Sequence, residues 1–291
     1  RAWAWLPHAG GGTPCSRATR HRRSGAGGPL SGVTRMPFDG YMGADFDTST
    51  LLEKMLSDPS SGVDAPAAII LETVQGEGGL NAARPEWVRK VAELAKEHGA
   101  LLIIDDVQAG CGRAGDFFSF DAMGITPDII TMAKSISGFG LPMALMLVRP
   151  GHDIFGPAEH NGTFRGNTHA FVTARIAIEK FWADDSFRDQ LAEKERMIVA
   201  ALAAIAEMVP GATLKGRGLM RGVDVGSGEL ASEICGRAYE QGLVIETSGP
   251  NDEVVKILAP ITTPDTLLRK GLNLLLNAVY DSTTNMKLAA E

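Results

Sequence analysis

The 291-residue sequence predicts an α/β fold built on a mostly parallel sheet, followed by a smaller α+β domain. Three observations support this prediction. Apolar runs that end on charged residues alternate with an amphipathic helix and with connections, which is typical of α/β domains. The run at 101–104 has no polar alternation, so it indicates a strand buried on both faces. The later part of the chain is dominated by long amphipathic helices.

The first half contains four strand-like apolar runs, at 67–71, 101–104, 128–132 and 143–148. Two helices are marked at their starts, since Asp47 can cap one and Pro85 can open the other. The second of these helices would end at Gly99, which stands at the C′ position. Its apolar residues are spaced for one helical face and are Trp87, Val88, Val91, Leu94 and Ala95.

The second half is predicted to be helical with short strands. Amphipathic helices are expected at 171–182, 187–208 and 230–239, and strands near 219–225, 243–246 and 254–258. The helix at 187–208 would expose one charged face, made of Glu193, Lys194, Glu195 and Arg196. A last helix has Thr263 as N-cap, Pro264 at its first position and Asp265 in its first turn.

The composition along the chain predicts three parts. Residues 1–24 mix Trp, Gly, Pro and Arg without any period, so we expect them to be poorly ordered or translated from a wrong frame or start. Residues 25–175 are expected to form a partial large domain. Residues 176–291 are expected to form the smaller C-terminal domain.

The composition also restricts the partners and the compartment. A net charge of −7 argues against nucleic acid or an anionic membrane surface as the main partner. Cys15, Cys111 and Cys235 are far apart and form no CxxC pair, so neither a disulfide framework nor a structural zinc site is indicated. No apolar run approaches the roughly 18 residues of a membrane span, and no signal-peptide pattern is present. A reducing cytoplasm fits these features best.

Charged side chains stand at the ends of three predicted strands. Glu72 follows the first, Asp105 follows the second, and Lys134 comes two residues after the third. One interpretation is a pyridoxal phosphate site in which Lys134 forms the Schiff base and Asp105 keeps the pyridine nitrogen protonated. The other is strand-end carboxylates with a solvated lysine. In open parallel sheets ligands bind outside the carboxyl ends of the strands, and three such residues at one crevice strengthen the first interpretation.

Four motifs in a fixed order, LETVQGEGG, IDDVQAGCGRAG, PDIITMAKSISGFGLPMA and HNGTFRGN, resemble the class III pyridoxal-phosphate aminotransferases of fold type I. The resemblance runs from about Gly25 to about Tyr280. It implies an enzyme that acts on small amino acids and oxo acids. It also implies a homodimer or larger homo-oligomer with shared active sites.

The strings HNGTFRGN and VIETSGPNDEVVKILAPIT look most like one group of this family, which acts in ectoine biosynthesis. The resemblance implies amino transfer from L-glutamate to L-aspartate 4-semialdehyde, giving L-2,4-diaminobutyrate and 2-oxoglutarate. It implies ping-pong kinetics through pyridoxamine phosphate. Relatives that act on acetylornithine, ornithine or 4-aminobutyrate are the alternatives.

The resemblance also implies a role for each site residue. Lys134 would be the Schiff-base lysine, and Asp105 the partner of the pyridine nitrogen. Gln108 would lie by the phenolic oxygen of the cofactor, unless it is a loop amide that caps local backbone. Thr163 would reach the cofactor phosphate of the neighbouring subunit, although by itself it is an ordinary loop threonine. Glu72 would lie near the substrate end of the site, unless it caps a turn.

The sequence departs from the family pattern in two places. Lys256 falls where many relatives have an arginine that binds the substrate α-carboxylate. A lysine cannot make the two parallel hydrogen bonds of a guanidinium, so either Lys256 binds the carboxylate less specifically or another residue binds it. Relatives also carry a long segment before the region matching Gly25, with a glycine-rich helix N-terminus for the phosphate and an aromatic residue for the ring. Because this chain has no match to that segment, we expect exposed apolar surface on the sheet and a truncated or frame-shifted gene model. An inactive truncated product is the alternative.

Overall fold

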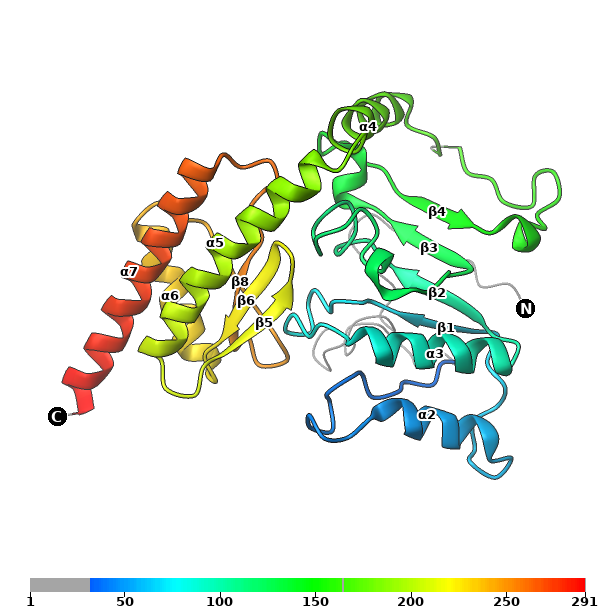
Figure 1. Ribbon diagram of the computed structural model, residues 1–291, viewed down its shortest axis with the longest axis horizontal. Coiled ribbons are helices and arrows are strands. Elements are labelled where there is room, and N and C mark those ends of the chain that lie inside the picture. The colour runs from blue at the N-terminus through cyan, green and yellow to red at the C-terminus, as the bar shows by residue number, and fades with distance from the viewer. Residues whose placement is uncertain (1–31, 164, 291) are drawn as a thin grey trace.

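The computed structural model describes residues 32–163 and 165–290, except for the side chains of 285–290. The expectation for residues 1–24 and the start of the family resemblance at Gly25 lie outside this range. The described elements form two groups that lie side by side, each with its own four-stranded sheet (Figure 1).

The first sheet holds β1 (Ala68–Leu71), β2 (Leu101–Asp105), β3 (Ile129–Met132) and β4 (Leu145–Val148), in that spatial order. β1, β2 and β3 run parallel to one another, and β4 is antiparallel to β3. The predicted mostly parallel sheet is therefore confirmed. Because the three parallel strands are neighbours, their carboxyl ends meet at one edge of the sheet.

Two helices accompany this sheet, α2 (Thr48–Ser57) and α3 (Pro85–Glu97). Both begin as predicted, because the Asp47 side chain accepts the Ser49 N–H at 2.9 Å and Pro85 opens α3. The buried residues of α3 are the predicted apolar stripe. That stripe packs against Leu102 and Ile104 of β2, which forms the core of the first group.

The other face of the first sheet is less covered than the sequence indicates. Residues of β2 alternate between buried and half-buried, so the prediction of a strand buried on both faces is wrong. The reason is that α3 covers only one face. Ile70 on β1 is 57% exposed, Met146 on β4 is also exposed, and the strand register places both on this face. The expected apolar surface is thus present on the described part of this sheet.

The second sheet is antiparallel throughout, with the spatial order β5-β6-β8-β7. Its strands are β5 (Thr213–Arg217), β6 (Met220–Asp224), β7 (Glu246–Ser248) and β8 (Val254–Ile257). Its helices are α5 (Ser186–Met208), α6 (Gly228–Glu240) and α7 (Asp265–Ala290). α5 and α6 each contact α7, and the three helices lie together beside this sheet (Figure 1). Leu202, Ile234 and Leu275 lie in the core between helices and sheet.

The second group differs from the sequence prediction at β5, at β7 and at the start of α7. β5 is absent from the prediction because its sequence, TLKGR, has no apolar alternation; it is held in place by its hairpin with β6. β7 lies at 246–248, whereas the apolar run at 243–246 predicts it earlier in the chain. In α7 the Pro264 carbonyl accepts the Leu268 N–H at 2.9 Å, so Pro264 occupies the N-cap position that the prediction assigns to Thr263.

The predicted exposed face of α5 is wrong for two of its four residues. Lys194 is buried, and its Nζ lies 2.9 Å from Oδ1 of Asp265 at the start of α7. Glu195 is half-buried and pairs with Arg221 on β6. Helical periodicity identifies the faces of a helix, but it does not reveal which distant element covers a given face.

α4 (Thr168–Phe181) connects the two groups along the chain and packs against the short turn η2 (Lys134–Ser137). The Thr173 hydroxyl of α4 donates a hydrogen bond to the Ser137 carbonyl at 2.7 Å. The predicted domain division at 175/176 falls inside α4, and that division stays a prediction. Two further turns, η1 (Asp121–Met123) and η3 (Pro150–His152), follow β2 and β4.

Candidate active site

Three charged residues, Glu72, Asp105 and Lys134, converge at the carboxyl edge of the first sheet, and we call them the strand-end cluster. Glu72 follows β1, Asp105 ends β2, and Lys134 opens η2 after β3. The charges interact, since Asp105 raises the pKa of Glu72 and Lys134 lowers it. The expected meeting of these side chains at one edge is therefore found in the structure.

Glu72 is the most perturbed carboxyl of this cluster. Burial, followed by the charge of Asp105, raises its pKa to about 7, although the Gly76 N–H and Lys134 act in the opposite direction. The Gly76 N–H donates to Oε1 of Glu72 at 3.2 Å. A carboxyl with a pKa near 7 can hold or release a proton at neutral pH, which suits a group at the substrate end of a site.

Asp105 is held by two hydrogen bonds to its Oδ1. The Val107 N–H and the Thr131 hydroxyl each donate to this oxygen, both at 3.1 Å. Thr131 lies on β3 directly opposite Asp105 in the parallel pair. The carboxylate is thus fixed by neighbouring elements and does not depend on a flexible loop.

Lys134 adopts an unusual backbone conformation at the end of β3. Its φ is +53°, in the left-handed region that non-glycine residues seldom adopt, and η2 begins with it. Its side chain is exposed. Backbone strain of this kind collects at functional sites, and here it presents the amine at the edge where the two carboxylates lie.

Gln108 covers the glycine loop that follows β1. A Cβ on Gly76 would lie 1.6 Å from Oε1 of Gln108, so only glycine leaves room for this side chain. Oε1 of Gln108 is buried and has no hydrogen-bond partner within the described chain, while Nε2 lies 3.5 Å from Glu77. A buried amide with an unpartnered atom indicates a site that a polar ligand completes.

Lys256 lies on β8 and is enclosed by carboxylates. Its side chain is fully buried, and its Nζ lies 3.2 Å from Oε1 of Glu77 and 3.0 Å from Oε1 of Glu246. Glu77 in turn contacts Gln108, so Lys256 connects to the site through a charged neighbour. A substrate carboxylate at Lys256 would have to compete with both glutamates, and its predicted role stays a prediction.

Thr163 is exposed in the loop between η3 and α4. No contact in the described chain brings it to the strand-end cluster, and its predicted role toward a neighbouring subunit also stays a prediction. Sequence reasoning missed Glu77, although it stands between the glycines of the quoted GEGG motif. A charged residue held between glycines next to a site is the signal that would have identified it.

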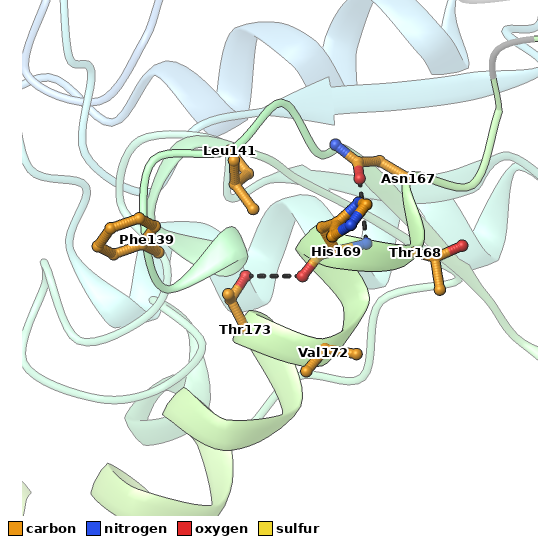
Figure 2. Close-up of a pocket in the computed structure, with 7 residues that line it drawn as sticks. All are labelled: Phe139, Leu141, Asn167, Thr168, His169, Val172 and Thr173. Atoms are coloured by element: carbon orange, nitrogen blue, oxygen red, sulfur yellow. Dashed lines mark hydrogen bonds between the residues drawn. The ribbon is translucent and has the colours of Figure 1, made fainter.

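An apolar hollow lies beside η2, between the loop after Lys134 and the first turns of α4 (Figure 2). Asn167 caps α4 by accepting the His169 N–H at 3.1 Å, and Thr173 donates to the His169 carbonyl at 3.2 Å, as Figure 2 shows. Its apolar walls are Phe139, Leu141 and Val172. With Phe139 79% exposed, this surface is suited to contact with another apolar surface.

Other chemistries find little support in the described residues. Burial raises the pKa of Cys111 to about 12, so its thiol is not an activated nucleophile. The described part of the chain contains no group of three or more His, Cys, Asp or Glu side chains that could hold a metal ion. Within the same residues, no helix is long and apolar enough to span a membrane.

Comparisons with known proteins identify the family of the chain. The model of the family "Aminotransferase class-III" matches residues 16–279. An uncharacterized aminotransferase of Sinorhizobium fredii is 52% identical, over 90% of this chain and 59% of its own length. A diaminobutyrate--2-oxoglutarate transaminase of Bordetella parapertussis is 49% identical, over 97% of this chain and 65% of its own length. This chain thus spans about three fifths of the length of these relatives.

Solved structures give the same result for the fold. N-acetylornithine aminotransferase from Stenotrophomonas maltophilia is 30% identical with a TM-score of 0.69, covering 85% of this chain and 62% of its own. The ornithine aminotransferase of Toxoplasma gondii, solved with partial occupancy of PLP at its active site, is 26% identical with a TM-score of 0.72, covering 84% and 57%. The chain therefore belongs to the class III aminotransferase family, whose enzymes depend on pyridoxal 5′-phosphate.

Proposed function

We propose that the protein is a pyridoxal-phosphate-dependent aminotransferase whose chemistry takes place at the strand-end cluster. The observation that carries this proposal is the convergence of a lysine and two carboxylates at the carboxyl edge of three parallel strands. Family membership supports it independently.

The residues present fit the cofactor. The Oε1 of Gln108, which has no partner within the described chain, supports a polar group beside the cluster, and Lys134 offers an exposed amine there. Lys134 would hold the cofactor through its amine, Asp105 through the ring nitrogen, and Gln108 beside the ring. Bound pyridoxal phosphate supplies an electron sink that lets an amino group leave one carbon and join another.

The side chains of this chain then have distinct tasks. Asp105, fixed by Val107 and Thr131, keeps a negative charge in place, which favours a proton on a ring nitrogen. Nζ of Lys134 takes the proton from the substrate carbon that bears the amine and returns it later. Glu72, with its pKa of about 7, changes its charge as substrates of different charge enter.

For the substrates, we propose amino transfer from L-glutamate to L-aspartate 4-semialdehyde, giving L-2,4-diaminobutyrate and 2-oxoglutarate, as in ectoine biosynthesis. Relatives named diaminobutyrate--2-oxoglutarate transaminase, at about half identity over most of this chain, support this choice. One site serving two substrates in turn gives ping-pong kinetics. Lys256, next to Glu77, is the proposed cation for a substrate carboxylate.

We also propose that the enzyme is a homodimer or larger homo-oligomer of the cytoplasm. Four apolar residues of α4 are exposed, and one of them, Val172, lines the hollow of Figure 2; the four are Phe171, Val172, Ile176 and Ile178. A surface of this kind is suited to a second copy of the chain. Thr163, in the exposed loop before α4, would then reach the cofactor phosphate across that interface. Widely spaced cysteines support a reducing compartment.

The substrate proposal is tested with purified protein and added pyridoxal phosphate. The expected results are a visible absorbance band from bound cofactor and a kcat/KM that is highest for aspartate semialdehyde with glutamate. A preference for acetylornithine, ornithine or 4-aminobutyrate would overturn the substrate assignment alone. Absence of any cofactor band would overturn the proposed function.

A further inference from the structure

A second polar cluster lies directly behind the strand-end cluster, where the two groups of elements meet. It consists of Thr73, Asp106, Ser119 and Arg217, and we call it the bridging cluster. Thr73 immediately follows Glu72, and Asp106 immediately follows Asp105. Arg217, in contrast, comes from β5 in the second group.

Arg217 contacts the first group at two points. Its Nη2 donates to Oγ1 of Thr73 at 3.3 Å and to the Ser119 carbonyl. The Thr73 hydroxyl donates to Oγ of Ser119 at 2.6 Å, so the three residues form one connected network. Both Thr73 and Ser119 are buried, which makes these bonds harder to replace by water.

Asp106 is the acidic member of this network. It is 1% exposed, and its Oδ2 accepts the Ser119 N–H at 3.0 Å. Gly110 packs so closely that an added Cβ would lie 2.9 Å from that oxygen. Burial raises the pKa of Asp106 to about 6, Ser119 lowers it, and the charges of Asp105 and Asp121 raise it further.

Charge ties Arg217 to this carboxylate. Burial lowers the pKa of Arg217, and the carboxylates of Asp116, Asp106 and Glu195 oppose that effect. Nε of Arg217 and Oδ1 of Asp106 are both buried without a hydrogen-bond partner in the described chain. A donor and an acceptor of opposite charge are thus left over in the same cluster, an arrangement that one bridging water or a small shift would satisfy.

We propose that Arg217 is a positioning residue that fixes the ends of β1 and β2 at the candidate active site. Its guanidinium donates directly to Thr73, the residue after Glu72, and its positive charge interacts with Asp106, the residue after Asp105. Without that cation, the adjacent carboxylates of Asp105 and Asp106 would repel one another at a buried position. The inference rests on the proposed function for its catalytic readout, and on the bridging cluster alone for its structural readout.

The test compares Arg217→Met with Arg113→Met. Arg113 is a matched control, because it also joins the two groups, through the Ala259 carbonyl, and only burial shifts its pKa. Arg217→Met is expected to lower kcat by roughly tenfold with little change in KM, because the strand ends lose their alignment. The acidic limb of its kcat profile should move to higher pH, because the neighbouring carboxyl of Asp106 ionises less readily once the cation is lost. Arg113→Met should lower the unfolding temperature without moving that limb.

A second readout does not need the cofactor. In the unliganded full chain, loss of the Arg217 cation raises the folded-state pKa of Asp106. The fall of unfolding temperature with rising pH, which begins near the ordinary pKa of 3.8 in both proteins, should therefore continue to higher pH in Arg217→Met than in wild type. If Arg217→Met fails to fold, Arg217→Lys is used. Lysine keeps the positive charge but lacks the several donors of the guanidinium, so this variant should have the wild-type pH profile and only part of the wild-type kcat.

Wild-type kcat and pH profiles in Arg217→Met would overturn the proposal. Equal shifts in the Arg113→Met control would also overturn it, since any interface arginine would then have the same effect. A wild-type protein that binds no pyridoxal phosphate would instead defeat the proposed function, and the unfolding profiles of the unliganded protein would still decide the role of Arg217.

Discussion

The two groups of elements differ in how their buried polar and charged side chains are partnered. In the second group, two buried lysines are paired with carboxylates: Lys194 with Asp265, and Lys256 with Glu246 and with Glu77 of the first group. In the first group, burial and the charge of Asp105 raise the pKa of Glu72 to about 7, and Gln108 has a buried amide oxygen that finds no partner among the described residues. The paired lysines of the second group hold neighbouring elements together, whereas the perturbed carboxyl and the unpartnered amide of the first group are features expected beside a ligand.

The largest expected effect is that of Lys134→Ala. The variant should lose the cofactor absorbance band and at least roughly a thousandfold in kcat, because among the described residues Lys134 is the lysine that follows the carboxyl end of a strand in the first sheet. Lys54→Ala on α2, an exposed lysine far along the chain from the cluster, is the control and should retain both. Substantial turnover in Lys134→Ala would place the chemistry elsewhere in the molecule.

Glu72→Gln tests whether the first group is destabilised by its own carboxyl. The pKa of Glu72 is raised from the ordinary value of 4.5 to about 7 in the folded protein, so the folded state binds this proton more tightly than the unfolded state. The resulting stabilisation is complete below pH 4.5 and is lost as the pH rises to about 7. Between pH 5 and pH 8 the free energy of unfolding of the unliganded wild type should therefore fall by about 2–3 kcal/mol more than that of Glu72→Gln. Urea titrations at both pH values measure the difference. Parallel pH dependence in the two proteins would show that Glu72 is not perturbed.

Lys256→Met tests the second group, where the charges are paired. Removing the lysine leaves Glu77 and Glu246 facing one another, and we expect a loss of about 2 kcal/mol, reduced from a fully buried pair because both glutamates reach solvent. Lys90→Met, which breaks the exposed pair with Glu53, should cost less than about 0.5 kcal/mol. Chemical denaturation compares them. A stability gain in Lys256→Met would mean that the lysine is kept for substrate alone.

Gly76→Ala should have the smallest effect on stability and a selective effect on binding. The added Cβ meets the flexible end of Gln108, which can move, so the unfolding free energy should change by less than about 1 kcal/mol. Cofactor affinity should fall by roughly threefold to tenfold because Gln108 is displaced from the site. Gly236→Ala on α6, where nothing lies within 4 Å, should leave affinity unchanged and slightly raise stability. An unchanged cofactor affinity in Gly76→Ala would show that Gln108 does not contribute to cofactor binding.

Local patterns in the sequence predict much of the first group. The apolar stripe of α3, the cap at Asp47 and the charged residues at three strand ends all follow from spacing within a few residues. The prediction fails where a distant partner decides the outcome. Lys194 is buried by α7, and β5 forms only because β6 pairs with it.

The site shows the same division. Glu72, Asp105 and Lys134 are identified by strand ends and motifs, because parallel strands bring their carboxyl ends together. Arg217 and Glu246 could not be identified in this way. Their contacts with Thr73 and Lys256 join strands to loops or to other strands through side chains, and no local spacing rule describes such contacts.

The central claim, that the amine at the end of β3 holds the cofactor, has a direct chemical test. The protein is loaded with pyridoxal phosphate, treated with borohydride to make the bond to the cofactor permanent, digested and mapped by mass spectrometry. The account predicts one modified residue, Lys134. Modification of another lysine in its place, or of none, would contradict it.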